Sequence, residues 1–304
     1  MKKSVILKEV PRKEVQLSPE KKPKDWGNIS FLLFVHVLAV LGIIWLCVHF
    51  AWQTIALGVL WFAFCGISIT GGYHRLFAHR TYEAALWLRL FYLAFGAASV
   101  QNSALKWSSD HRTHHAKVDL EEDPYNIRRG FWWAQIGWVL YKNAKRDFSN
   151  VPDLLRDRLI MFQHRFYVPL AILFGAVIPY VLGVLWGDPI GALLVAGFTR
   201  LALQYHATGA VNSVAHSFGK QPYGTGNSAR DHWVTAIITL GEGYHNFHHY
   251  FSWDYRNGVR WWQFDPTKWF VWILSRFGAT ASLKRTPWSR IDQVRRTVKK
   301  QKTV

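Results

Sequence analysis

Hydrophobic positions along this chain form long runs without charge. No Asp, Glu, Lys or Arg occurs from Trp26 to His74, from Phe166 to Gly187, or from Pro189 to Thr199. A helix needs about 20 apolar residues to cross a bilayer. The first run therefore predicts two spans joined by a tight turn, and each later run predicts one more. The expected spans are residues 31–50, 53–72, 166–186 and 191–211.

The polar sections that separate these runs are rich in Lys and Arg, whereas the turns at 51–54 and 187–190 have neither. Positive residues accumulate on the cytoplasmic side of membrane proteins. We therefore expect an all-α integral membrane protein, in which four transmembrane helices carry a cytoplasmic helical cap. The N-terminus, the C-terminus and the polar sections would all be cytoplasmic. A cleaved signal peptide fits the long basic leader poorly.

Three segments follow from this arrangement: a basic cytoplasmic leader at 1–25, one domain at 26–260, and a basic cytoplasmic C-terminal segment at 261–304. Residues 85–105 are apolar enough to resemble a fifth span, but they contain Arg89. A charge at the bilayer centre is costly. We therefore interpret this segment as an interfacial or buried helix.

The formal net charge is +18, which raises the question of nucleic-acid binding. The basic residues flank hydrophobic runs, so we expect contact with membrane lipid or an acidic partner and no nucleic acid. Lys142, Lys145, Arg146, Arg156 and Arg158 are candidates for such a docking face. The only cysteines, Cys47 and Cys65, lie inside expected spans, so neither a disulfide framework nor a thiolate site is indicated.

Histidines gather in four tight groups beside the expected spans. Positions i, i+3 and i+4 share one face of a helix, so an HxxHH segment presents three imidazoles to one small volume. Imidazole is a good ligand for Fe, Zn, Cu or Ni. The groups are His74 and His79; His111, His114 and His115; Asn212 and His216; and His245, His248 and His249.

Nine histidines suit two metal ions, but their chemistry alone leaves zinc and iron both open. Zinc hydrolases typically use three protein ligands and an open position. The Glu plus Glu-x-x-His pattern of soluble di-iron proteins does not accompany these groups. The remaining five histidines, each on its own, are interpreted as ordinary core or surface residues. Asp110, Glu242 and Asn246 are candidates for hydrogen bonding to the ligands, and equally for helix caps.

The four groups resemble the histidine boxes of the membrane-bound fatty acid desaturase family, especially the stearoyl-CoA (delta-9) type. The matching segments are 72–82 (GYHRLFAHRTY), 110–115 (DHRTHH), 212–216 (NSVAH) and 241–249 (GEGYHNFHH). The resemblance covers roughly residues 26–254. It implies that one iron is bound by His74, His79, His111, His115 and His249. The other would be bound by His114, His216, His245 and His248, with Asn212 acting through a water.

The reaction implied by this resemblance is O2-dependent formation of a cis double bond in a long saturated fatty acyl chain. Electrons would come from a separate donor such as a cytochrome b5, ferredoxin or rubredoxin-type protein. Family positions for the acyl carrier match Asn28, Asn102, Asp110 and Lys142. Positions that shape the kinked acyl tunnel match Gln101, Trp107 and Thr208, and the tunnel end matches Phe62 and Gly66.

The sequence also departs from the family pattern. Ser109 stands where animal members have an arginine, Asn143 replaces a basic residue, and Gly209 replaces a tryptophan. Lost cations weaken a CoA phosphate site, because such sites use charge-assisted hydrogen bonds. A phospholipid or acyl-carrier-protein ester is the alternative carrier.

Two other functions remain open at this stage. A fatty-acid or alkane hydroxylase would use the same histidine cluster, since both reactions begin with abstraction of a hydrogen. A non-enzymatic membrane metal-binding protein is the second rival. Transporters usually hold their ligands near the bilayer midplane, whereas these histidines lie beyond the ends of the expected spans.

Overall fold

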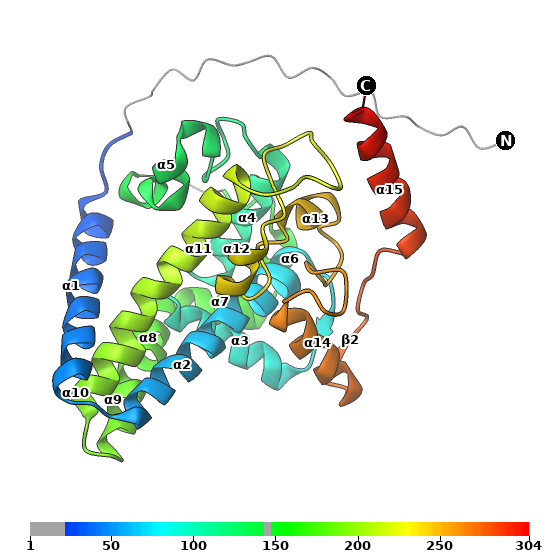
Figure 1. The fold of residues 1–304 in the computed structure, drawn as a ribbon. Helices are drawn as coiled ribbons and strands as arrows, with labels where there is room; N and C mark the ends of the chain where they lie inside the picture. Colours follow the sequence, from blue (N-terminus) through cyan, green and yellow to red (C-terminus); the bar gives the residue numbers. More distant parts are fainter. Residues whose placement is uncertain (1–21, 143–146, 304) are drawn as a thin grey trace.

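Long helices run side by side in one part of the molecule, and shorter helices gather around one end of these long helices (Figure 1). This computed structural model describes residues 22–142 and 147–303. Most of the expected leader, residues 1–21, lies outside the described residues, as do Asn143, Lys145 and Arg146. The long elements are α1 (Trp26–Val48), α2 (Trp52–Ile67) with its π-helical continuation η1 (Ser68–Ala78), α8 (Tyr167–Ile172), η4 (Leu173–Val177), α9 (Ile178–Val184), α10 (Pro189–Ala192), η5 (Leu193–Thr199) and α11 (Arg200–Ser217).

Three helices in the described part of the chain are long and apolar enough to cross a membrane: Trp26–Val48, Trp52–Ala78 and Tyr167–Val184. They contain the first three expected spans almost entirely. In the first and third helices most apolar side chains face outward, as at Leu33 and Val184, which are 66% and 58% exposed, whereas half of the second is buried. In water such a surface would be unfavourable, and lipid covers it without that cost.

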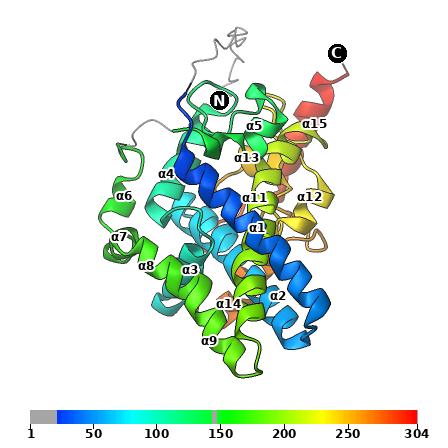
Figure 2. The ribbon, with the colours of Figure 1, turned by 90° about the vertical axis from the view of Figure 1, so that its left-hand side faces the viewer.

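The fourth expected span, 191–211, lies within one continuous helix formed by α10, η5 and α11. Its second half is more polar, because it carries Arg200, Gln204 and His206. Figure 2 shows α1 lying across α11, so this helix is packed against a neighbour rather than isolated.

Asp188 ties together the two short turns at the end of the bundle remote from the cap. Its carboxylate accepts hydrogen bonds from Trp45 Nε1 (3.0 Å), Thr54 Oγ1 (2.6 Å) and the backbone N–H of Gly191 (2.9 Å). The last bond caps the N-terminus of α10. One carboxylate thus joins α1, α2 and α10 and holds the turns 51–54 and 187–190 side by side.

The segment 85–105, expected to be interfacial or buried, forms α3 (Leu86–Ala98) and the start of α4 (Ala104–Lys117). With 13 residues, α3 is about 20 Å long, too short to cross a bilayer. Arg89 forms an ion pair with Asp157. The length of α3 and the ion pair of Arg89 therefore agree with the expectation that this segment is not a fifth span.

The cap consists of short elements joined by loops: η2 (Ile127–Arg129), α5 (Phe131–Gln135), η3 (Gly137–Leu140), α6 (Pro152–Leu155), α7 (Arg158–Arg165), α12 (Trp233–Ile238), α13 (His245–Tyr250), α14 (Pro266–Arg276) and α15 (Trp288–Gln301). Two short antiparallel strands, β1 (Glu83–Ala84) and β2 (Thr280–Ala281), pair across it. The apolar face of α15, with Ile291 and Val294, packs on Phe247 and Phe251, which border the histidines of α13.

Arg200 is buried in α11, where a bare charge would be costly. Its Nη1 donates to the carbonyl of Ala98, and its Nε donates to the carbonyl of Ala196, both at 2.9 Å. Ala98 is the last residue of α3, where carbonyls lack helical partners and a cation is favourable. Arg200 therefore caps the C-terminus of α3 inside the protein.

We predict that Arg200→Leu lowers the stability of the folded protein. Removing the guanidinium leaves the buried Ala98 carbonyl without its partner, which costs about 1–3 kcal/mol. Thermal unfolding in detergent measures this as a lower midpoint. The matched control is Arg296→Leu, on the exposed face of α15; equal midpoints for the two variants would contradict this role of Arg200.

Candidate metal centre

His74 and His79 lie on one face of the chain because the helix that carries them is a π-helix. A π-helix is closed by i→i+5 hydrogen bonds, and the N–H of His79 bonds the carbonyl of His74 at 3.0 Å. Residues five apart are therefore about one turn apart, as they would not be in an α-helix. The two ring centroids lie 4.9 Å apart.

The two HxxHH segments form α-helical turns, in α4 and in α13. Successive residues of an α-helix point about 100° apart, whereas i and i+4 nearly coincide. In each segment the i and i+4 histidines therefore point to one place and the i+3 histidine to another. His216 reaches the same region from the end of α11.

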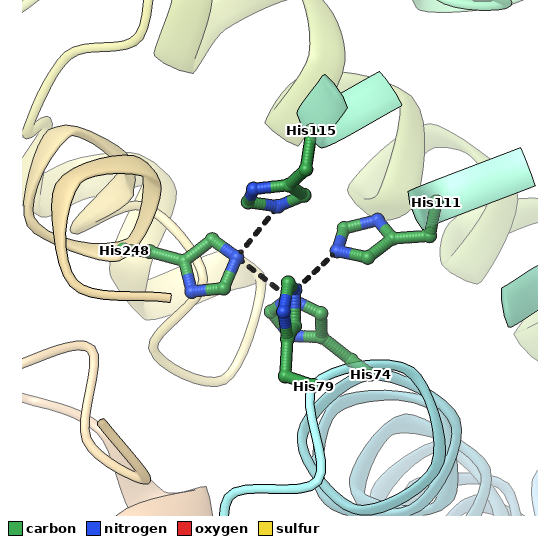
Figure 3. A group of neighbouring side chains, drawn as sticks. All are labelled: His74, His79, His111, His115 and His248. Atoms are coloured by element: carbon green, nitrogen blue, oxygen red, sulfur yellow. Dashed lines mark hydrogen bonds between the residues drawn. The ribbon is translucent and has the colours of Figure 1, made fainter. Parts of the chain in front are cut away.

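The nine histidines converge as two adjacent groups. Their ligand nitrogens lie within 4.8 Å of one another in each group. Figure 3 shows the rings of the first group turned toward a common centre. The groups touch where the rings of His115 and His249 stack, with centroids 4.2 Å apart. The first group contains His74, His79, His111, His115 and His248, and the second contains His114, His216, His245 and His249.

The expected division between the two groups was wrong for one adjacent pair. His248 belongs with the first group and His249 with the second, the reverse of the expectation. The reason is helix geometry: His249 lies four residues after His245 and shares its direction. The two HxxHH segments are thus used reciprocally, since each gives a pair to one group and a single ring to the other.

Three of these histidines hydrogen-bond through Nδ1 to polar groups behind them. His74 Nδ1 lies 2.8 Å from Glu242 Oε2, and His114 Nδ1 lies 2.8 Å from Asp123 Oδ1. His216 Nδ1 lies 2.6 Å from Ser228 Oγ, which in turn bonds Asp119. Acceptors of this kind hold the proton on Nδ1 and leave Nε2 free to bind a metal.

Burial favours the neutral form in most of the clustered histidines. Loss of hydration, together with the neighbouring imidazoles, holds the pKa of His79, His111, His115, His248 and His249 well below the ordinary value. The same causes lower the pKa of His245 to about 3. Metals bind the neutral form of imidazole, so these rings are ready to act as ligands at neutral pH.

The spacing of the inward nitrogens fits metal ions. Nε2 atoms meet at 2.9 Å between His74 and His248, at 2.8 Å between His79 and His111, and at 3.2 Å between His114 and His249. Ligands at right angles around a metal, with bonds of about 2.1 Å, lie about 3 Å apart. His216 Nε2 is buried and has no hydrogen-bond partner among the described residues. A cation in each group would satisfy these lone pairs.

A cavity of about 610 Å³ opens onto both groups, bordered by His74, His111, His114 and His245. This volume is typical of a site for a small molecule or cofactor. Asn212, which lies one helical turn before His216, also borders it. All nine residues expected to contact the substrate line this one cavity: Asn28, Phe62, Gly66, Gln101, Asn102, Trp107, Asp110, Lys142 and Thr208.

A hydrogen-bonded chain links the wall of this cavity to the histidines. Gln101 Nε2 donates to Thr208 Oγ1 at 2.9 Å, and Trp107 Nε1 donates to Gln101 Oε1 at 3.4 Å. The Trp107 ring stacks on His111, with centroids 4.8 Å apart. The wall is therefore fixed relative to the first histidine group.

Sequence reasoning missed several polar residues behind the ligands. Asp119, Asp123 and Ser228 lie in loops without periodicity. Closeness in sequence to the second box was the one signal for Asp119 and Asp123, and Ser228 had none. Of the three candidates named, Glu242 bonds His74, while Asp110 lines the cavity. Asn246 instead bonds loop backbone, at the N–H of Tyr223 and the carbonyl of Gly224, both at 2.8 Å.

Comparison with known proteins agrees with this site. The model of the "Fatty acid desaturase" family matches residues 50–272, a range that includes all nine histidines. The chain belongs to the fatty acid desaturase family. Within the family it is 40% identical over 290 residues to a "Probable acyl-CoA desaturase" of Schizosaccharomyces pombe, covering 92% of this chain and 60% of that protein.

Two further family members differ in length from that protein. "Acyl-CoA desaturase 1" of Saccharomyces cerevisiae is 45% identical over 238 residues, which are 77% of this chain and 47% of that protein. The "sn-1 stearoyl-lipid 9-desaturase" of Anabaena variabilis is 32% identical over 272 residues, 86% of this chain and 95% of that protein. The chain thus spans about half the length of the two fungal relatives.

We predict that Asp123→Asn weakens metal binding at the second group. The amide keeps the size of the side chain but not the charge that orients His114, and such changes typically cost about 10–100-fold in affinity. The metal content that remains as the chelator concentration rises measures this loss of affinity, and circular dichroism checks that the variant is folded. Glu122→Gln, at the exposed neighbouring position, is the control; Asp123→Asn retaining metal as the control does would contradict the prediction.

Proposed function

We propose that this protein is an O2-dependent di-iron desaturase that introduces a cis double bond into a long saturated fatty acyl chain, as an acyl-CoA and at the delta-9 position. The observation that carries this proposal is the meeting of two imidazole groups with one cavity. A pair of redox metals beside a cavity of this size suits oxidation of an unactivated chain. Family membership supports the same reaction.

Iron fits the ligands better than zinc does. The nine histidines would supply four or five imidazoles to each ion, with Asn212 acting through a water at the second, whereas a catalytic zinc typically takes three protein ligands. Imidazole suits iron. When bound, the iron pair would supply the oxygen chemistry, in which O2, two protons, two donor electrons and two hydrogens of the chain give two waters and the double bond.

The chain's own residues contribute the position of the substrate. Gln101, Thr208 and Trp107 form a polar bend in the cavity wall, and an acyl chain lying against it would be held bent beside the histidines. Holding one C–C pair in place determines both where the bond forms and its cis geometry. Phe62 and Gly66 would limit how far the chain reaches.

The carrier is proposed to be CoA, with contacts from Asn28, Asn102, Asp110 and Lys142 at the cavity. The names of the two fungal relatives support an acyl-CoA substrate. The Anabaena relative is named for a lipid-linked substrate. Ser109 is turned away from the cavity and donates to Asn150 Oδ1 at 2.8 Å, so it adds nothing to a phosphate site.

Two electrons per turnover would come from a donor protein of the cytochrome b5, ferredoxin or rubredoxin type. The protein would be a multi-pass membrane protein with its active site on the cytoplasmic side, beside the basic cap. Lys142, Arg156 and Arg158 are described residues of the proposed docking face, and charge complementarity would speed the encounter with an acidic donor.

Lipid analysis of expressing cells tests the proposed reaction directly. We predict a new cis-monounsaturated acyl chain with the wild-type protein, and its loss in His114→Ala, which removes a ligand of the second group. His49→Ala is the control, because His49 is exposed at the end of α1 remote from the cap. Hydroxylated products without a new double bond would favour the hydroxylase. Undiminished product in His114→Ala would overturn the site.

A second experiment tests the proposed end of the cavity. A Cβ at Gly66 would lie 2.5 Å from Leu240 Cδ1, and both residues line the cavity. Gly66→Val should therefore shorten the available channel and shift the products toward shorter acyl chains. Val59→Leu, exposed on α2, should leave the profile unchanged; a wild-type profile in Gly66→Val would contradict this assignment.

A further inference from the structure

Residues 261–277 expose an unusual amount of aromatic surface. Trp261, Phe277 and Trp262 are 83%, 80% and 60% exposed. On α14 the buried side chains are Thr267, Lys268 and Val271. Phe270 and Leu274 pack on the core, whereas Trp269, Trp272 and Ile273 face out. We call this surface the aromatic face; it comprises Trp261, Trp262, Phe264, Trp269, Trp272, Ile273 and Phe277.

The aromatic face continues onto α3. Strands β1 and β2 pair, and the N–H of Ala85 bonds the carbonyl of Ala279 at 2.9 Å. The end of α14 is thereby fastened to the start of α3, where Leu86, Trp87 and Leu90 are also exposed. In both ribbon views α14 lies at the level of α3 (Figures 1 and 2). It is closer to α9 than α5 and α15 are.

The surface extends on its other side to α12. Thr267 at the start of α14 donates to the carbonyl of Leu240, just after α12. The exposed side chains of α12 are Trp233, Val234, Ile237 and Ile238. Three short elements that are distant in sequence thus present apolar side chains beside the long helices whose outer surface is itself apolar.

The charges around the aromatic face suit a membrane interface. Arg276 lies over the Trp272 ring at 4.7 Å, and Arg260 precedes Trp261. The one acidic residue within 261–277 is Asp265, which is fully buried. Tryptophan and cations with no exposed acid are characteristic of segments that lie among lipid headgroups.

We propose that the aromatic face, with the exposed sides of α3 and α12, inserts into the leaflet on the metal-centre side as a monotopic anchor. Residues 261–277 would then not be part of a purely aqueous C-terminal segment, and the aqueous part would begin after β2, toward α15. A bilayer is the occupant favoured here because the face is continuous with helices of membrane-spanning length. The proposal rests on those helices and does not depend on the reaction.

The anchor would determine how deep the metal centre sits. Asp265, the N-cap of α14, bonds Arg75 through Nη1 at 3.2 Å and Nη2 at 3.0 Å. Arg75 Nη2 also bonds Glu242 Oε1 at 2.9 Å, and Glu242 holds His74. A rigid chain of ion pairs therefore connects the N-terminus of α14 to His74, one of the candidate metal ligands.

Site-directed spin labelling in single-copy nanodiscs tests this anchor. In a Cys47→Ser background, with the buried Cys65 retained, single cysteines are placed by Trp262→Cys, Ile273→Cys and Phe277→Cys. The matched control is Thr297→Cys, exposed on α15. Each label is exposed to dissolved O2, which concentrates in lipid, and to a water-soluble nickel complex.

We expect O2 to relax the labels at 262, 273 and 277 more strongly than the nickel complex does. At 297 we expect the nickel complex to relax the label more strongly than O2 does. Because the readout is accessibility, it is independent of desaturase activity. Three labels that behave like the one at 297 would overturn the anchor. Labels shielded from both reagents in single-copy nanodiscs, or shielded only in nanodiscs that hold two copies, would overturn it in favour of a protein contact.

Discussion

The structure depends on one electrostatic constraint: nine imidazoles turn their Nε2 atoms toward each other in a largely buried space. Lone pairs at about 3 Å repel unless a proton or a cation lies between them, and the Nδ1 partners Glu242, Asp123 and Ser228 direct protons away from that space. The cap helices are therefore arranged around positions for positive charge. The residues that contact the histidines, including those of the cavity wall, are positioned by this arrangement.

The bundle supplies what the cap cannot supply alone. α4 and α13 are short, and the histidines that they carry must meet rings from η1 and α11, which belong to the long helices. The π-helical turn at His74, the carboxylate of Asp188 and the guanidinium of Arg200 each fix one part of the bundle relative to another. Rigid long helices thus position a site at one of their ends, next to where an acyl chain would leave the lipid.

Much of this could be predicted from the sequence, because the governing costs are large and local. Charge-free runs predict helices since charge in lipid is expensive, and HxxHH spacing predicts convergent rings. The fourth helix is less clear from composition, because Arg200 and Gln204 find partners only in the folded protein. The π-helix at His74, the reciprocal use of His248 and His249, and the loop carboxylates Asp119 and Asp123 depend on tertiary geometry. α14 has 11 residues, which are too few for a span. The sequence therefore predicts its outward aromatic face only as part of a basic C-terminal segment.

The central claim, that the two histidine groups hold one iron each, is tested most directly by anomalous diffraction at the iron edge from crystals of the purified protein. The account predicts two peaks, one surrounded by His74, His79, His111, His115 and His248, and the other by His114, His216, His245 and His249. A single peak, or peaks that disappear at the iron edge and appear only at the zinc edge, would contradict it.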